Sequence, residues 1–192
     1  MYVTSVLNSS RRTPRPDRWL ICLDLQREFV VPGRPHYAEA ADRVASACIK
    51  VLEHARASGW RVVHTQLRLA DGASFGGGLF GAPIEGLRPL ITEPVFLRRS
   101  LSAFADGDFA AELRAAWGAE VFLIGFSLAD TCLATALSAV DLGVELTLVE
   151  DAVGAGGELA ASAAEAGRSI LRPFTRTVTS DDLAMSDAEI AL

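Results

Sequence analysis

The chain has 192 residues, of which 50% are apolar and 22% charged, and its mean hydropathy is +0.26. This length predicts one domain with a substantial core, and the high apolar content excludes a disordered chain. The longest apolar runs, such as 121–125, have the length of a strand, so no membrane span is expected. The net charge of −6 and a pI near 5.1 argue against a nucleic-acid-binding surface.

Residues 1–18 are predicted to form a flexible N-terminal arm, and residues 19–192 the folded domain. The cysteines are three and scattered, without metal-ligand spacing, which predicts free thiols in a reducing cytoplasm. Lys50 is the single lysine of the chain, and its place off the apolar stripe of its helix predicts a solvated side chain. The arm carries the only basic cluster, which prolines interrupt: Arg11, Arg12, Pro14, Arg15, Pro16 and Arg18.

Short apolar runs alternate with helical patterns along the rest of the chain. Apolar residues at steps of three and four predict a helix over 38–58, which Gly59 closes. Ser180-Asp181-Asp182 predicts the N-terminal cap of a last short helix. The predicted strands are 19–23, 61–66, 93–98, 121–125, 146–150 and 175–179, and the other predicted helices are 109–117, 131–142 and 158–171.

Six strands separated by helices predict an α/β fold. The expected form is a single-domain, Rossmann-like three-layer sandwich, in which helices cover both faces of a six-stranded parallel sheet. In such sheets the functional crevice lies at the carboxyl ends of the strands. This rule points to Asp24, Gln66, Arg98 and the turn 125–131 as candidate site residues.

Asp24 directly follows an apolar strand. On position alone it is either a turn or helix-capping residue, or a desolvated carboxyl group with a raised pKa that serves as a general acid or base. Arg98 and Arg99 follow another strand. They are either surface charges or, where one points into the crevice, a permanent cation suited to holding a carboxylate.

The turn from Gly125 to Cys132 joins a strand to a helix, whose first N–H groups favour an anion or a thiolate. Cys132 is therefore either a nucleophile or a small buried residue of the first helical turn. The glycine-rich segment 71–81 lacks the Lys-Ser/Thr of a phosphate-binding loop and is predicted to be a mobile lid. The three histidines are scattered, so no metal site is expected.

Four segments share features with one family. WLICLDLQREF at 19–29 contains Asp-x-Gln and a nearby Phe, and RRSLSAF at 98–104 ends in Ser-Ala-Phe. Residues 123–143 join a strand, a turn and a helix, and residues 149–152 end in an acidic residue, Asp and Ala. In this order, from about residue 19 to the end of the chain, they resemble the isochorismatase-like hydrolase family of the cysteine hydrolase superfamily.

The resemblance implies a six-stranded parallel sheet and, for most members, a Cys nucleophile with an Asp base and a Lys. Asp24 matches the aspartate. The lysine position falls on Arg98, and the nucleophile position, counted from the glycines at both ends of the motif, falls on Thr131 rather than Cys132. The Cys-Asp-Lys triad is therefore predicted to be absent.

At the nucleophile turn the chain is more similar to the isochorismatase branch, in which a cysteine follows the nucleophile position. In that branch the aspartate protonates a vinyl ether, and no covalent nucleophile is needed. Gln66 matches a glutamine that contacts the substrate there, whereas Phe80 and Ser127 stand at positions of a tryptophan and a tyrosine. The residues expected to contact substrate are Gln66, Phe29, Phe80, Ser127 and Cys132.

The leading hypothesis is a cofactor-free hydrolase of a small anionic substrate, most specifically an isochorismate-like vinyl ether, with Asp24 as general acid or base. Arg98 would bind a carboxylate, and the Thr131 N–H would stabilise an anion. Two alternatives stay open: a small-amide hydrolase that uses Cys132, and a catalytically inactive binding or assembly protein. We expect a homodimer or larger homo-oligomer, with no nucleic-acid or membrane partner.

Overall fold

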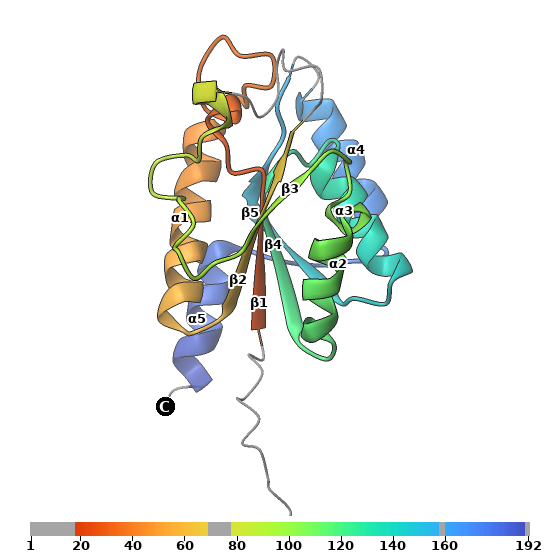
Figure 1. Ribbon diagram of the computed structural model, residues 1–192. Helices are drawn as coiled ribbons and strands as arrows, with labels where there is room; N and C mark the ends of the chain where they lie inside the picture. The colour runs from red at the N-terminus through yellow and green to blue at the C-terminus, as the bar shows by residue number, and fades with distance from the viewer. Residues whose placement is uncertain (1–17, 69–77, 158–159, 191–192) are drawn as a thin grey trace, which may run out of the picture.

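The computed structural model of the protein describes residues 18–68, 78–157 and 160–190. Its centre is a six-stranded parallel sheet with the order β3-β2-β1-β4-β5-β6, which confirms the predicted α/β fold (Figure 1). The strands are β1 (Arg18–Leu23), β2 (Arg61–Leu67), β3 (Val95–Arg98), β4 (Glu120–Phe126), β5 (Leu146–Gly154) and β6 (Arg176–Val178).

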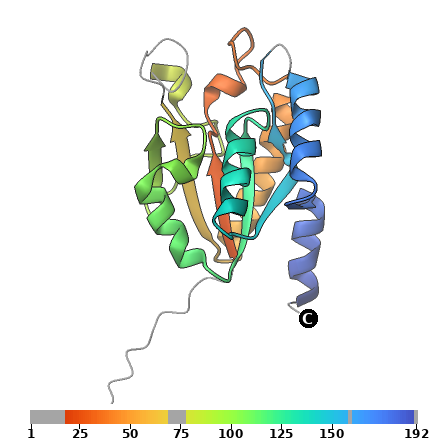
Figure 2. The same ribbon diagram turned by 90° about the vertical axis from the view of Figure 1, so that its right-hand side faces the viewer.

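Helices cover both faces of this sheet, as Figures 1 and 2 show. One face carries α1 (Ala41–Ala57) and α5 (Ser180–Ile190), and the other carries α2 (Gly107–Leu113), α3 (Thr131–Asp141) and α4 (Ala160–Leu171). The three-layer sandwich expected from the sequence is therefore present. Short 3-10 helices lie at η1 (Arg27–Phe29), η2 (Gly78–Gly81), η3 (Ala103–Ala105) and η4 (Arg114–Ala116).

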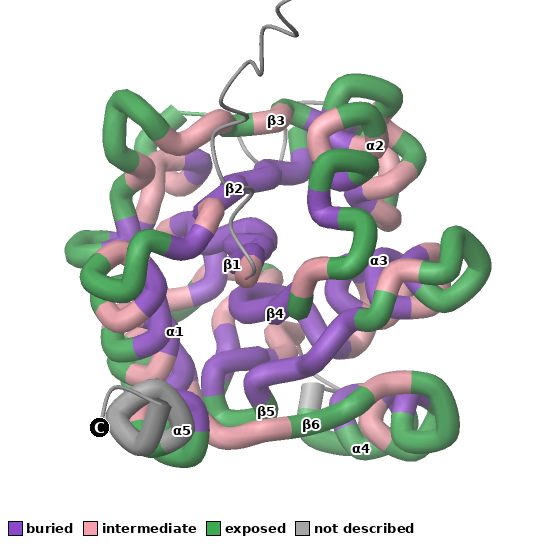
Figure 3. The backbone as a smooth tube through the Cα atoms, turned by 90° about the horizontal axis from the view of Figure 1, so that it is seen from below, coloured by how far each residue is buried: buried purple, intermediate pink, exposed green. Residues whose placement is uncertain are grey.

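The alternation of side chains along the strands explains the two layers of core. In β1, Leu20 and Cys22 point to the cluster under α1, while Ile21 and Leu23 point to the cluster under α2, α3 and α4. Both sets are buried because helices cover both faces of β1. This explains why residues 19–23 of the strand are an unbroken apolar run. Figure 3 shows the inner strands buried and the outer helix surfaces exposed.

Several predicted boundaries differ from the structure, three of them as follows. Arg18 belongs to β1 rather than to an N-terminal arm, and its guanidinium binds Glu120 on the neighbouring β4. β5 continues past Glu150 to Gly154, because its last residues keep pairing with β4 after a register shift. The helix expected over 109–117 gives way after Leu113 to the 3-10 turn η4. Residues 1–17 of the predicted arm and 71–77 of the predicted lid lie outside the described residues.

The cap of α5 also differs from the prediction. The N–H and the hydroxyl of Thr179 donate to the Asp182 carboxylate, and the Asp182 N–H donates to the Thr179 hydroxyl oxygen. This is the reciprocal arrangement of a capping box. Ser180 instead donates from its N–H and its hydroxyl to Asp151 of β5, at 2.8 and 2.6 Å. The start of α5 is thus stabilised by hydrogen bonds within its own first turn and by hydrogen bonds to β5. Lys50, predicted to be solvated, is half exposed and pairs with Asp181 at this point.

The strand order places the topological switch point of the sheet between β1 and β4, the position at which sheets of this kind bind ligands. The chain leaves β1 toward β2 and leaves β4 toward β5, so the connections at the carboxyl ends diverge at this point. Gly125 lets the two strands approach: its φ is +126°, and a Cβ atom there would lie 1.8 Å from the Leu23 carbonyl oxygen. The candidate site residues of β1, β3 and β4 all lie at this end of the sheet.

Candidate active site

Asp24 lies directly after β1 in a left-handed conformation, with a φ of +50°. Aspartate is one of the few residues that tolerate this region, which costs most others about 1–3 kcal/mol. The conformation lets the Asp24 N–H donate to the Thr65 carbonyl at 2.9 Å and directs the side chain into the protein, where it is fully buried. Asp24 is therefore a buried carboxyl group at the crevice, rather than a helix cap.

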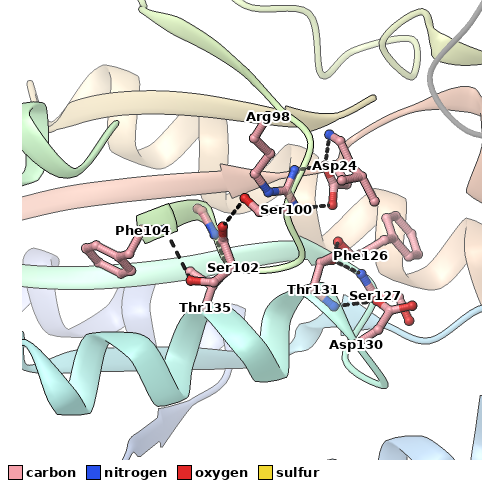
Figure 4. A network of polar contacts seen from close by, with 12 residues as sticks. Asp24, Arg98, Ser100, Ser102, Phe104, Phe126, Ser127, Asp130, Thr131 and Thr135 are labelled. Atoms are coloured by element: carbon pink, nitrogen blue, oxygen red, sulfur yellow. Dashed lines mark hydrogen bonds and ion pairs between the residues drawn. The ribbon is translucent and has the colours of Figure 1, made fainter. Parts of the chain in front are cut away.

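Arg98, the last residue of β3, reaches Asp24 and clamps its carboxylate with both terminal nitrogens (Figure 4). Its Nη1 and Nη2 lie 2.7 Å from Oδ1 and 2.6 Å from Oδ2. The Leu67 N–H, at the end of β2, donates to Oδ1 at 2.6 Å. Both charged side chains are fully buried, so the pair is sealed from solvent.

The pKa of Asp24 is raised from its ordinary value because burial penalises the charged form. The guanidinium of Arg98, the N–H of Leu67 and the hydroxyl of Thr131 act in the opposite direction. Burial and the hydrogen bonds to Asp24 thus shift the pKa of this carboxyl group in opposite directions, and burial has the larger effect.

The prediction for Arg98 was a cation that holds the carboxylate of a ligand. In the structure both of its terminal nitrogens bind the chain's own Asp24, and its Nε is buried without a hydrogen-bond partner among the described residues. Arg99, the other candidate, is exposed. A direct role of Arg98 in binding substrate stays a prediction.

Thr131, at the position of the family's nucleophile, fixes the turn between β4 and α3. Its hydroxyl donates to the Phe126 carbonyl at 2.8 Å and accepts from the Ser127 N–H at 2.9 Å. Asp130 caps α3 by accepting from the Thr131 N–H. A hydroxyl has one proton, and Thr131 donates it to the Phe126 carbonyl. The side chain is therefore held as part of the turn (Figure 4).

Cys132 is fully buried in the apolar cluster between the sheet and α2, α3 and α4. Burial raises the pKa of its thiol well above the ordinary value, and the negative charges of Asp24 and Asp130 add to the effect. Its N–H donates to the Ser127 carbonyl at 2.9 Å. The thiol therefore has the surroundings of a structural cysteine, unlike the electropositive setting of a reactive one.

The other predicted contact residues are divided between the crevice and the core. Gln66 and Ser127 are buried beside the Asp24 partners, Gln66 next to Leu67 and Ser127 next to the Thr131 hydroxyl. Phe29 is buried and stacks on Phe126, with ring centroids 4.8 Å apart. Phe80, in η2, lies under the Arg34 guanidinium at 4.1 Å.

Several site residues escaped the sequence analysis. The Leu67 donor is a backbone group, which no side-chain pattern reveals. Thr135 and Ser138 of α3 hold the segment after Arg98: the Ala103 N–H donates to Thr135 at 3.0 Å, and the Ser102 hydroxyl to Ser138 at 2.8 Å. The Ser-Ala-Phe motif at 102–104 was the available signal for this contact.

Two buried polar side chains close to the crevice were also missed. Gln26 donates to the Gly81 carbonyl at 3.3 Å, and Glu28 accepts from Arg34 at 2.9 and 2.8 Å. Each keeps one oxygen without a partner among the described residues. The polar letters of the Asp-x-Gln-x-Glu run at 24–28, placed after a buried strand, were the signal for them.

The described part of the chain has no group of three or more His, Cys, Asp or Glu residues placed to hold a metal ion. Within it, no helix is long and apolar enough to cross a membrane.

The sequence matches the isochorismatase domain family over residues 18–181. This protein belongs to the isochorismatase family. A maleamate amidohydrolase of Pseudomonas putida is 27% identical to this isochorismatase-family chain over 151 residues, which cover 70% of the chain and 71% of the relative. Membership of the family, together with a relative named as an amidohydrolase, supports a hydrolase.

Solved structures have the same fold. An isochorismatase family protein from Desulfovibrio vulgaris matches with a TM-score of 0.77 at 24% identity, over 92% of this chain and 100% of the other. A cysteine hydrolase from Pseudomonas syringae pv. phaseolicola matches with a TM-score of 0.74 at 18% identity, over 88% and 91%. At these identities the likeness supports the fold alone.

Proposed function

We propose that this family member hydrolyses a small anionic substrate without a covalent nucleophile, with Asp24 as general acid and base. The observation that carries the proposal is the hydrogen bonding of the Asp24 carboxyl group. Among the hydrogen bonds between the described residues, Oδ1 accepts from Leu67 and Arg98, and Oδ2 accepts from one nitrogen of Arg98. Oδ2 therefore keeps a position at which it can carry a proton to or from a substrate.

The most specific substrate class is a vinyl ether of the isochorismate type. The acid form of Asp24 gives its proton to the terminal carbon of the double bond, and water adds to the resulting oxocarbenium carbon while the Asp24 carboxylate takes a proton from that water. The hemiketal then breaks into pyruvate and an alcohol, its hydroxyl proton passing to the leaving oxygen. Burial supports the first step because it raises the pKa of Asp24 and so favours the acid form.

The state of the two residues at the nucleophile position supports a mechanism without covalent catalysis. The Thr131 hydroxyl donates its proton to the Phe126 carbonyl and accepts from the Ser127 N–H, so it is engaged in the turn rather than directed at a substrate. The Cys132 thiol is buried with a raised pKa, which favours the unreactive thiol form. Neither has the setting of an activated nucleophile.

The amidase relative favours a second candidate, hydrolysis of a small amide that carries a carboxylate. In that case Cys132 would form an acyl intermediate and release ammonia. The tight Asp24–Arg98 pair favours the third possibility, an inactive binding protein, because a clamped carboxylate is poorly placed to exchange protons. The three candidates differ in measurable products.

The test measures pyruvate release from isochorismate and ammonia release from maleamate by the wild-type chain, Asp24→Asn and Cys132→Ala. We expect wild-type pyruvate release, a loss of at least ~100-fold in Asp24→Asn, and a rate within about threefold in Cys132→Ala. Loss of activity in Cys132→Ala would support the amidase instead. Turnover of neither substrate by folded wild-type protein would support the binding protein.

A pH profile adds an independent measurement. When the acid form of Asp24 starts the reaction, the rate falls as the pH rises through the pKa of Asp24. Arg98 lowers this pKa, so Arg98→Met is expected to raise it and to move the falling limb of kcat to higher pH. A limb that stays in place, or one that moves to lower pH, contradicts the assignment of Asp24 as the acid.

A further inference from the structure

A groove of about 640 Å³ opens at the amino ends of β4 and β5, the end of the sheet opposite Asp24. It runs from α2 and η4 to the turn between α3 and β5, and Figure 3 looks onto this end of the molecule. Trp117 lines the first side and is 75% exposed, and Leu142 lines the second and is 52% exposed. Further apolar side chains in the lining are Phe104, Leu113 and Val144. An open apolar surface of this kind marks an interaction site.

The charged residues of this groove are mostly acidic, and the groove adjoins the start of the described chain. Glu120 and Glu145 are exposed lining residues, against one basic lining residue, Arg114. Arg18 lies next to Glu120 in the sheet and binds its carboxylate at 2.6 Å. Because neighbouring strands are ~4.8 Å apart, residues 1–17 join the fold about one strand spacing from the groove wall.

Residues 1–17 lie outside the described residues, and their sequence has two parts. Residues 2–7 carry no charge and are mostly apolar, with Tyr2, Val3, Val6 and Leu7. Residues 8–17 carry three arginines and one aspartate, which are Arg11, Arg12, Arg15 and Asp17. When extended, this second part spans up to about 33 Å, which is ample for residues 2–7 to reach the groove.

We propose that residues 2–7 of this chain bind in the groove, with the arginines of residues 8–17 beside Glu120 and Glu145. The apolar side chains of the segment and of Trp117 then leave water together, which is favourable in proportion to the apolar area buried. In this arrangement the arm is a bound part of the domain rather than the flexible segment expected from the sequence. The groove lies at the opposite end of the sheet from Asp24, so the bound segment leaves the candidate active site free.

Two features favour the chain's own segment over a separate partner. The first is the short tether, which gives residues 2–7 an effective concentration in the mM range at the groove. The second is charge complementarity, because the basic cluster of a chain with net charge −6 lies in residues 11–18, next to Glu120. A separate peptide has no tether and would need both the apolar and the basic part.

The first test uses Trp117 as the reporter. The chain has three tryptophans, and the other two, Trp19 and Trp60, are 2% and 9% exposed. Acrylamide quenching of fluorescence in the full chain therefore measures whether Trp117 is covered. Val6→Ser/Leu7→Ser removes two apolar side chains and is expected to weaken docking by ~100-fold or more. The quenching constant then rises, and the emission shifts to longer wavelength.

The matched control is Ser9→Ala/Ser10→Ala, which changes two residues just outside the apolar segment and is expected to keep the wild-type quenching constant. Adding Trp117→Phe to Val6→Ser/Leu7→Ser is expected to abolish the rise, since the remaining tryptophans are buried. Circular dichroism checks that each variant is folded.

Three results of this test overturn the proposal. One is a wild-type quenching constant equal to that of Val6→Ser/Leu7→Ser, and another is a rise that persists without Trp117 or that the control shows equally. The third is protection of Trp117 that increases with protein concentration, because a second copy would then supply the segment.

The second test identifies the segment that lies at the groove. Leu142→Cys takes a photoreactive benzophenone maleimide on the groove wall, since the native cysteines are all buried. Irradiation is expected to give a cross-link within one chain, and mass spectrometry after trypsin digestion is expected to place it in peptide 1–11, which ends at the first arginine. Met185→Cys, 65% exposed on α5 at the other face of the sheet, is the matched control and is expected to give no cross-link to this peptide. A Leu142→Cys product without peptide 1–11, or one that joins two chains, overturns the proposal.

Discussion

At the scale of single residues, the site depends on one ion pair. Asp24 and Arg98 are fully buried, and the bidentate contact satisfies both charges at once. Such a pair adds little net stability, since desolvation offsets the attraction, but removing one partner leaves an uncompensated charge in the interior. The effect of a substitution at Asp24 therefore depends on what remains at Arg98.

We expect Asp24→Asn to lower the free energy of unfolding by about 3–5 kcal/mol, because Arg98 is left buried and unpaired. The double variant Asp24→Asn/Arg98→Gln removes both charges and is expected to recover most of this loss. Urea denaturation at pH 7 of the wild type, both single variants and the double variant measures the coupling. Additive effects of the two single substitutions would contradict a direct ion pair.

This double variant also gives the activity test its control. Asp24→Asn is informative about turnover only where it is folded, and the double variant lacks the same carboxylate without the unpaired charge. Loss of turnover in both, with native circular dichroism in the double variant, assigns the loss to the carboxyl group rather than to unfolding.

At the scale of elements, the close approach of β1 and β4 shapes the end of the sheet at which Asp24 lies. The two strands pair in parallel from Arg18 with Glu120 to Leu23 with Gly125, after which the chains separate to Asp24 and to the turn that Thr131 holds. Gly125 is the point of contact, because any side chain there would overlap the Leu23 carbonyl. The position of Asp24 thus depends on a glycine in the neighbouring strand.

Gly125→Ala is expected to destabilise the protein by about 3 kcal/mol or more, since the added Cβ would lie 1.8 Å from a backbone oxygen at a positive φ. The matched control is Gly143→Ala, where φ is also positive (+69°) but no atom lies within 4 Å of the added Cβ. It is expected to cost about 1 kcal/mol. Thermal unfolding of the two variants separates the clash from the backbone strain, and equal losses would contradict the close approach.

At the scale of the whole molecule, Glu93 ties three parts of the chain together. It accepts from Arg56 of α1 at 2.8 Å, from the Leu90 N–H at 2.8 Å, and contacts His64 of β2 at 2.9 Å. Burial by itself would raise the pKa of Glu93. The hydrogen bonds have the larger combined effect and lower this pKa from 4.5 to about 2. The native state therefore binds fewer protons at Glu93 than the unfolded chain does.

The sign of this difference predicts how stability depends on pH. The contribution of Glu93 is complete above its unfolded pKa near 4.5 and is lost as the pH falls toward 2. The difference in unfolding free energy between the wild type and Glu93→Gln should therefore shrink from pH 5 to pH 2. Glu112→Gln, which breaks the partly exposed pair with Arg61, is expected to cost about 1 kcal/mol or less. A constant difference for Glu93→Gln would contradict the prediction.

The sequence by itself determined the architecture and the main candidates at the site. Apolar runs and helical periodicity are properties of neighbouring residues, so they predicted the six strands, the five helices and the parallel sheet. Position at strand ends then singled out Asp24 and Arg98, and the resemblance to the family singled out Thr131 as the nucleophile position. The structure pairs Asp24 with Arg98 and holds Thr131 in the turn after β4.

Only the tertiary structure decided what these residues do to one another. Arg98 meets Asp24 across 74 residues of chain, and the Leu67 N–H meets it across 43. Local patterns carry no information about such contacts, because a hydrogen bond depends on the distance and direction between atoms that folding brings together. For the same reason the cap at Thr179, the length of β5 and the buried thiol of Cys132 followed from packing between elements rather than from the sequence around each residue.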